Sequence, residues 1–260
     1  MKNFHSIVRS VLACAAVSAV LAGGNAWADL TESQAHSLEQ EIAAGDKAGL
    51  KTLRTEARRG NKHAQFYLGD LYFLGIGVPR DYSQAAQWFR KAAEQGDESG
   101  QFYLGMLYCG GLGVPQDYSQ AAQWLRKAAE QGDAFSQYKL GGFYLEGQGV
   151  PQDYSQAAQW FRKAAAQGNA KAQRALGTLY ANGQGVPGNK VVAYALFNLS
   201  AARESSRDDH GTSESRSKVS NDMSAQAIEA GRALSREMMV SGNLLKALDG
   251  YMGAAESKSR

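Results

Sequence analysis

A 36-residue period restricts the fold of this chain more than any other feature of its sequence. The segment from Asp81 to Ala93 returns unchanged from Asp153 to Ala165. Such a period is typical of a solenoid, because one unit has too little apolar surface to fold alone and must stack on its neighbours. The period is marked by the string Gly-x-Gly-Val-Pro, which occurs four times, beginning at Gly75, Gly111, Gly147 and Gly183.

Each unit is predicted to form two short helices, which we call A and B. In the first unit helix A runs from about His63 to Leu74, and the glycine-rich loop with its proline ends it. Asp81 stands where an N-cap of helix B is needed, with Gln84 at the third helical position. Gly96 ends helix B, and Asp97 can cap the next helix A. Helices of about 12 residues are marginal in isolation, so contacts between units must stabilise them.

Positions that differ between otherwise near-identical units predict a binding surface. In helix A, Gln65, Leu68, Gly69 and Tyr72 keep their identity in all four units, whereas the residues beside them vary. Equivalent positions that have the same packing in every repeat should keep the same residue. The variable positions are therefore expected to face solvent or a partner. Drift on an exposed face is one interpretation, and a partner-binding face is the other, favoured by the aromatic content. The candidate partner-binding residues are Phe66, Tyr67, Asp70, Phe73, Phe102, Tyr103, Met106, Tyr138, Lys139 and Arg174.

These residues resemble the Sel-one-like repeat (SLR) family, a relative of the tetratricopeptide repeat. The similarity covers about residues 63 to 206 and includes Leu68-Gly69, Trp88-Phe89 and Gln95-Gly96. The fourth unit departs from the pattern, with Leu196 in place of Trp, and looks like a terminal unit. The resemblance implies an all-α solenoid, a right-handed superhelix whose A helices line a concave surface. It also implies an adaptor or scaffold that binds a partner protein or peptide in that groove.

The predicted organisation has seven parts. Ser224 looks like an N-cap, followed by an amphipathic helix through Ile228, Gly231, Leu234 and Met238 that would cover the last repeat. The stretch from Glu204 to Asp222 is polar and is expected to be a loop or a loosely formed helix. The predicted parts are a signal peptide (1–28), capping helices (29–62), repeats at 63–98, 99–134 and 135–170, a degenerate repeat (171–206), and a polar loop with capping helices (207–260).

The amino-terminal segment predicts export. Lys2 and Arg9 precede an apolar run, and Ala26-Trp27-Ala28 fits a cleavage site after Ala28. The run is too short to favour a membrane span, and no second one follows, so we expect no transmembrane segment in the mature chain. A lipoprotein modified at Cys14 is the disfavoured alternative, because apolar residues continue beyond it. We therefore expect a periplasmic protein with a partner in the cell envelope, and the sequence leaves further secretion open.

Composition and motifs argue against several other classes of function. Removing Lys2 and Arg9 leaves 26 basic and 25 acidic residues, without a basic stripe, so we expect no nucleic-acid partner. No zinc-binding spacing of histidine or cysteine occurs, and the glycine-rich loops follow helices, unlike phosphate-binding loops. Trp88, Trp124 and Trp160 flank the apolar stripe of helix B, where packing between repeats is preferred over a cofactor site. We expect neither a metal nor a cofactor.

An enzyme acting on cell-wall material or β-lactams is the alternative function. Some cysteine-rich exported relatives are described as penicillin-binding or β-lactamase-like, and those carry a cysteine pair in each repeat. In this sequence Cys14 belongs to the expected signal peptide, so Cys109 is the one cysteine of the repeats. S-x-x-K strings occur at Ser136 to Lys139 and at Ser215 to Lys218, without the S-D-N and K-T-G partners of a β-lactamase. We therefore expect no enzyme. A dimer bridged by Cys109 is left open, although a tolerated small side chain is the preferred interpretation.

Overall fold

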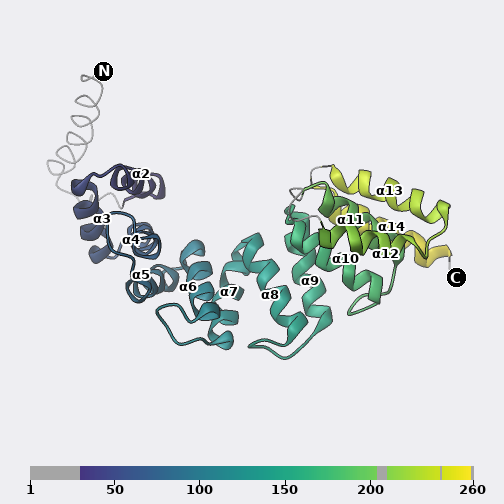
Figure 1. The fold of residues 1–260 in the computed structure, drawn as a ribbon, viewed down its shortest axis with the longest axis horizontal. Helices are drawn as coiled ribbons and strands as arrows, with labels where there is room; N and C mark the ends of the chain where they lie inside the picture. Colours follow the sequence, from purple (N-terminus) through teal and green to yellow (C-terminus); the bar gives the residue numbers. More distant parts are fainter. Residues whose placement is uncertain (1–29, 204–209, 241, 259–260) are drawn as a thin grey trace, which may run out of the picture.

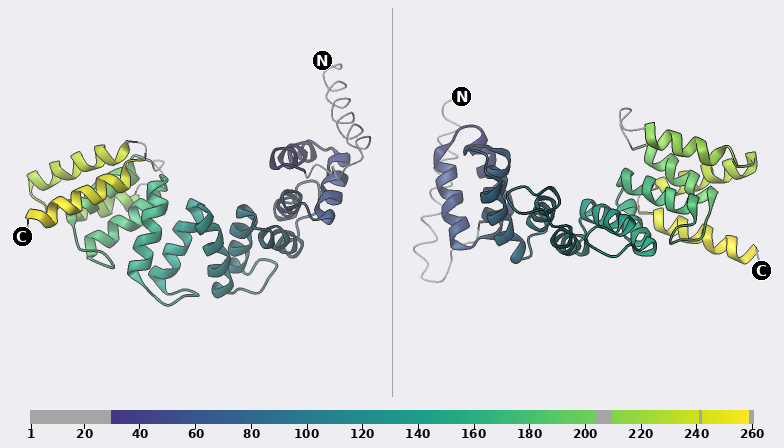
Figure 2. Two further views of the ribbon diagram at one scale, coloured as in Figure 1. Left: turned by 180° about the vertical axis from the view of Figure 1, so that it is seen from behind. Right: turned by 60° about the horizontal axis from the view of Figure 1, so that its bottom comes forward.

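The computed structural model describes residues 30–203, 210–240 and 242–258, and within these ranges every regular element is an α-helix. The expected signal peptide and its cleavage site lie outside the described residues. The helices stack in chain order into an elongated, curved array, which is an α-solenoid as expected (Figure 1). The curvature is three-dimensional, as views from behind and from below show (Figure 2).

Each repeat supplies one A helix and one B helix. The A helices are α4 (Lys62–Leu74), α6 (Glu98–Gly110), α8 (Ala134–Glu146) and α10 (Ala170–Asn182). The B helices are α5 (Tyr82–Glu94), α7 (Tyr118–Gln131), α9 (Tyr154–Ala166) and α11 (Lys190–Ala201). Before them come α2 (Glu32–Ala43) and α3 (Lys47–Arg59), and after them α12 (His210–Ser220), α13 (Ala225–Met239) and α14 (Leu244–Lys258).

The predicted caps form. The Asp81 carboxylate accepts hydrogen bonds from the backbone N–H groups of Ser83 and Gln84, at 2.9 and 3.0 Å. The Asp97 carboxylate accepts one from the backbone N–H of Gly100, at 2.7 Å, and so caps the next A helix. These bonds satisfy donors that every helix N-terminus leaves open, and they fix where each short helix begins.

The second glycine of the loops that begin at Gly111, Gly147 and Gly183 lets one repeat touch the backbone of the repeat before it. Gly113 has a φ of +69°, and a Cβ placed there would lie 2.2 Å from the carbonyl oxygen of Tyr82. Gly149 meets Tyr118 in the same way, with a Cβ 2.1 Å from its carbonyl oxygen. The loop therefore rests directly on the first turn of the preceding B helix, and only glycine fits there.

Buried glutamines join the repeats. The Gln95 side-chain amide donates to the Gly60 carbonyl at 2.8 Å and to Gln65 Oε1 at 2.7 Å. Gln65 is 4% exposed, and its amide nitrogen donates to the Ala57 carbonyl at 3.1 Å. Three helices, α3, α4 and α5, thereby meet at one pair of side chains. The same bonds recur around Gln131 and Gln167, which contact Gln101 and Gln137 respectively.

A glycine in each A helix admits the large core residue of the B helix. A Cβ at Gly69 would lie 2.7 Å from the ring of Phe89, which is fully buried. Gly105 faces Leu125 in the same way. The two helices of a repeat therefore approach closely at this glycine, around one apolar side chain.

Arginine–tyrosine hydrogen bonds show that the repeat geometry extends beyond the four units. Each joins a B helix to the next A helix over 18 residues, as between Arg90 and the Tyr108 hydroxyl. Arg54 of α3 makes the same contact with Tyr72, so α3 occupies the place of a B helix. At the other end Arg216 of α12 donates to Asn198 Oδ1 at 3.4 Å, again over 18 residues. Helix α12 therefore takes the place of a fifth A helix.

Helix α12 lies within the stretch for which we expected a polar loop or a loosely formed helix. Thr212 and Val219 are its buried residues, 0% and 9% exposed, and α12 packs against α11. The predicted helix after Ser224 forms as α13, whose Gly231 lies against Tyr194 of the last B helix. Helices α13 and α14 lie side by side at this end of the array (Figure 2).

Replacing Gly113 with alanine tests the contact between loop and helix. We expect Gly113→Ala to lower the free energy of unfolding by about 2–4 kcal/mol, because it adds a backbone clash to the cost of a positive φ. Gly96→Ala is the matched control, since Gly96 has a φ of +82° with nothing within 4 Å of its Cβ position. That control should cost about 1 kcal/mol. Equal shifts of the urea midpoint in the two variants would show that the contact with Tyr82 does not matter.

Candidate partner-binding surface

The side chains that project from successive A helices form a continuous surface, which we call the A-helix face. Rings join α4 to α6, with the centroids of Phe66 and Tyr103 5.8 Å apart. Rings also join α6 to α8, with the centroids of Phe102 and Phe135 6.5 Å apart. No ring contact joins one B helix to the next among the residues that the structure describes. The A helices are thus in side-chain contact along the row.

Several predicted binding residues also hold the array together. The ring of Tyr103 stacks on Phe89 at 5.1 Å between centroids, and Phe66 and Phe73 both pack against the same cluster. Tyr67 is buried, only 9% exposed, although variable positions were expected to face solvent or a partner. The physical reason is that these rings are long enough to fill the gap between one A helix and the next. In this part of the face the variable residues are largely packing residues.

The middle of the face presents side chains to solvent. Lys139 is exposed, while Phe102, Met106 and Tyr138 are half-buried. Phe135 is 65% exposed, more than any other large apolar side chain described, and it was not among the predicted residues. The sequence held a signal for it, because its equivalents in the other repeats are different residues: His63, Ser99 and Lys171.

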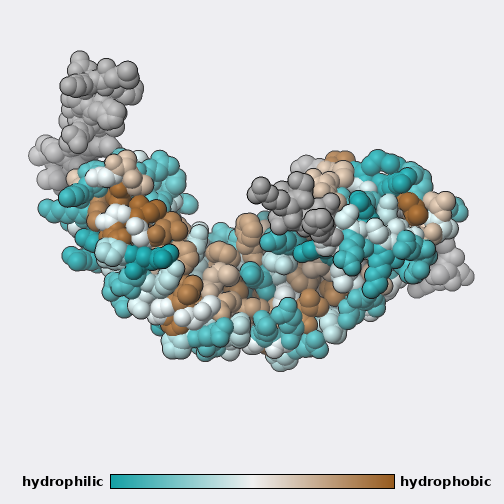
Figure 3. Space-filling model, viewed as in Figure 1, coloured by the Kyte–Doolittle hydropathy of each residue, from teal (hydrophilic) through white to brown (hydrophobic). Residues whose placement is uncertain are grey.

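The amino-terminal part of the face is acidic as well as aromatic. Asp70 of α4 meets Glu39 of α2, and burial together with this contact raises the pKa of Asp70 to about 7. Burial and the nearby carboxylates, Glu32 first among them, raise the pKa of Tyr67 to about 12. Two carboxyl groups that meet in a partly buried place favour sharing one proton. Apolar atoms gather over α3 and α4, whereas hydrophilic atoms predominate over α10 to α14 (Figure 3).

The carboxy-terminal part of the face is hollowed and basic. A pocket of about 460 Å³ lies between α8, α10 and α12. Arg174, one of the predicted residues, lines it together with Lys171. Glu214, Ser215 and Lys218 also line it, and they lie on α12, outside the predicted repeats. They lie at a fifth place along a face for which we had predicted four repeats, and the sequence there carries no repeat motif that could have found them.

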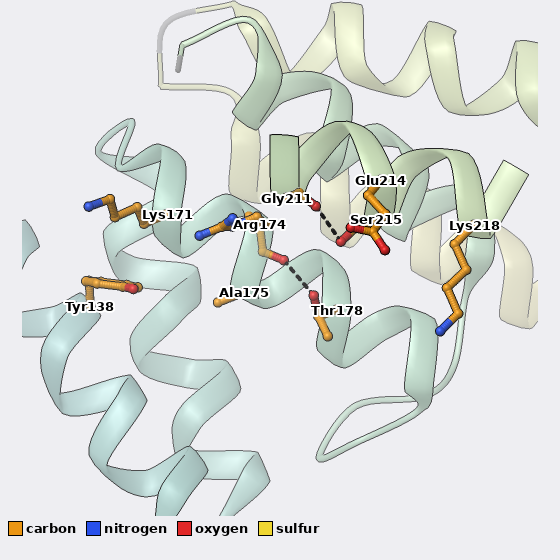
Figure 4. Close-up of a pocket in the computed structure, with 9 residues that line it drawn as sticks. All are labelled: Tyr138, Lys171, Arg174, Ala175, Thr178, Gly211, Glu214, Ser215 and Lys218. Atoms are coloured by element: carbon orange, nitrogen blue, oxygen red, sulfur yellow. Dashed lines mark hydrogen bonds between the residues drawn. The ribbon is translucent and has the colours of Figure 1, made fainter. Parts of the chain in front are cut away.

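The pocket has an elongated arrangement of charge. Arg174 lies between Lys171 and Lys218, with Tyr138 of α8 at the far edge (Figure 4). The Ser215 hydroxyl donates to the Gly211 carbonyl at 2.8 Å, and the Thr178 hydroxyl donates to the Arg174 carbonyl at 3.2 Å. These two hydroxyl protons are therefore used in hydrogen bonds within their own helices. The groups free to donate to a ligand are the three cations and Tyr138.

Two other predicted features have definite surroundings. Cys109 is half-buried, and burial raises the pKa of its thiol above the ordinary value, which disfavours the reactive thiolate. Ser136 is fully buried whereas Lys139 is exposed, so the first S-x-x-K string does not bring its serine to the surface. Across the described residues there is no group of three or more His, Cys, Asp or Glu side chains that could hold a metal ion. None of the described helices is long and apolar enough to span a membrane.

Comparison with known proteins identifies the repeats. A family model described as Sel1 repeat matches residues 62–97, 99–133, 134–169 and 170–205. Among solved structures, a Sel1 repeat protein from Oxalobacter formigenes is similar with a TM-score of 0.59 and 38% identity, over 67% of this chain and 50% of its own. A protective antigen of uropathogenic Escherichia coli strains, which displays an SLR fold, has a TM-score of 0.46 and 26% identity, over 86% of this chain and 64% of its own. This chain thus spans half of the first protein and less than two thirds of the second. No curated protein matches it.

The raised pKa of Asp70 predicts a stability that depends on pH. Because the folded state holds this proton up to about pH 7 and the unfolded state releases it near pH 3.8, the free energy of unfolding should fall as pH rises between those values. Asp70→Asn should remove that loss and be more stable than the wild type at pH 8, by on the order of 1 kcal/mol after allowance for solvent screening. Urea unfolding of both proteins at pH 5 and pH 8 measures it. A difference between the two proteins that is the same at both pH values would contradict the assignment.

Proposed function

This chain belongs to the Sel1 repeat family, and on that premise we propose that it is an adaptor that holds a segment of a partner protein against its A-helix face. Sel1 repeats form a scaffold of a general protein–protein interaction type, generally without catalysis. The observation that carries the proposal is the exposed ring of Phe135 on this face. It lies beside Phe102 and is 65% exposed, and aromatic residues are enriched where proteins contact one another.

The variation among the repeats supports the same surface. Repeats that are almost identical in their B helices differ at Phe135, Tyr138 and Lys139 and at the equivalents of these residues. The exposed B-helix position of Gln87, Gln123 and Gln159 is the same in the first three repeats, and only the fourth repeat differs, with Ala195. A surface that only had to stay soluble could vary on either side. Variation concentrated on the A helices is expected when each repeat contacts a different part of one partner.

We infer a non-catalytic role in the periplasm. The amino-terminal segment with its expected cleavage after Ala28 supports export, and the cell envelope then supplies the partner. For the enzymatic alternative, the pairing of a serine nucleophile with a lysine is absent at Ser136, which is buried with no hydrogen-bond partner for its hydroxyl in the described structure. The proposal is therefore binding without turnover.

A variant of the A-helix face should still fold when each new residue is one that occurs at the equivalent position of another repeat. We expect Phe135→Ser, Tyr138→Arg and Lys139→Ala, combined, to lose the envelope partner that the wild type crosslinks. Each new residue already stands at the equivalent place in another repeat, as Ser99, Arg174 and Ala175. Crosslinking in intact cells followed by mass spectrometry measures the partner.

The matched control changes the opposite surface. Gln87, Gln123 and Gln159, replaced together by glutamate, alter three exposed B-helix positions and should leave partner capture unchanged. Capture that survives in the A-helix variant and fails in this control would move the binding surface to the B helices. Thermal unfolding of both variants separates loss of binding from loss of the fold.

A further inference from the structure

The pocket between α8, α10 and α12 holds cations that the rest of the structure leaves without a partner. Lys171, Arg174 and Lys218 form no ion pair with any described carboxylate. Glu214 is the only acidic residue that lines the pocket, so its wall carries a net charge of about two positive units. Unpaired cations that line one hollow place create a positive potential that attracts anions.

Several cations of the B helices are used in the packing of the array. The B-helix lysines lie over tryptophan rings, as Lys91 does over Trp88 at 4.1 Å. The B-helix arginines bond to tyrosine hydroxyls, and Arg162 also pairs with Asp249 at 2.6 Å. Lys171, Arg174 and Lys218 make no such ring contact or ion pair among the described residues, and all three line one pocket.

The position of Arg174 depends on the residue opposite. A Cβ at Gly211 would lie 2.6 Å from the Arg174 Nη1 atom, so the guanidinium rests against the backbone of α12. The equivalent place in other A helices holds larger side chains, among them Tyr67 and Tyr103. Gly211 thus makes room for the guanidinium at the fifth place of the row.

We propose that this pocket binds the carboxylates of an acidic segment of the partner protein. The inference rests on the proposed function and names the chemistry of the segment. Arg174 provides a fork of donors suited to a carboxylate, and Lys171 and Lys218 lie on either side of it (Figure 4).

The shape of the charge favours a short acidic peptide over other anions. Cations spread along a pocket of about 460 Å³ match several carboxylates in sequence better than they match one small ion. A long polyanion such as a nucleic acid would follow the face towards α4, where it would meet Asp70 and Glu39. Tyr138 also lines the pocket, and its ring can take an apolar neighbour of the acidic residues.

The test uses purified protein and two fluorescein-labelled peptides. One has three consecutive glutamates flanked by leucines, and the other has glutamines in their place. Fluorescence anisotropy should show at least about tenfold tighter binding of the glutamate peptide, with affinity that falls as salt rises. Arg174→Tyr, which introduces the residue of the equivalent position Tyr138, should weaken that binding about tenfold or more.

Further variants and a competitor make every outcome decisive. Lys171→Gln with Lys218→Gln should weaken binding as Arg174→Tyr does, and Lys246→Gln, an exposed charge on α14, should leave it unchanged. Equal binding of both peptides, or wild-type binding by Arg174→Tyr, overturns the proposal. Displacement of the glutamate peptide by inorganic phosphate at equal concentration also overturns it, since the pocket would then be a site for any small anion. If the glutamate peptide fails to bind while the Phe135 variant still loses its envelope partner, the adaptor function stands and this inference alone is wrong.

Discussion

The stack depends on the buried hydrogen bonds of its glutamines. Gln65 and Gln101 lie in the interior, 4% exposed each, where an unpaired amide would cost a few kcal/mol. Each is satisfied only when the preceding B helix ends beside it and the following B helix brings a second glutamine to its carbonyl oxygen. The geometry of one repeat is thereby fixed by its two neighbours. The glutamine pairs stop after the third repeat: Arg203 takes the place of the next glutamine of the series, and Gln173 Oε1 is buried without a donor in the described structure.

Much of this architecture could be predicted from the sequence because it rests on local rules. Asp81 caps a helix and Gly75 ends one through short-range geometry, and the exact period places these signals in every unit. The packing of the variable residues could not be predicted in the same way. Phe66 contacts Tyr103 of the next repeat, so a variable position is free to change when its neighbour in the next unit changes as well. Variation therefore does not by itself distinguish exposure from a contact between two varying residues.

The carboxy-terminal part of the A-helix face could not be predicted from the sequence for a different reason. Helix α12 keeps the geometry of an A helix while losing nearly all of the A-helix residues, with Thr212 where the other repeats have leucine and Arg216 where they have tyrosine. Its place is set by packing on α11, a tertiary contact that no local pattern encodes. Arg174 was predicted from the sequence as a partner-binding residue, but the pocket that it lines also needs α12 opposite. The face consequently changes in chemistry along its length, from aromatic and acidic to basic.

The contacts between successive repeats are alike, and this similarity has a consequence for how the repeat array can evolve. Asp81 to Ala93 and Asp153 to Ala165 are identical, and the glutamine contacts around Gln95 and Gln167 match. The same contact between neighbouring repeats can therefore form at more than one place in the array. Recombination between two repeats within the gene would remove or add whole units of 36 residues and keep the glutamine contacts between the repeats that become neighbours. The length of the A-helix face can therefore change only by whole repeats. Its acidic amino-terminal end and its basic carboxy-terminal end stay with the helices that flank the array.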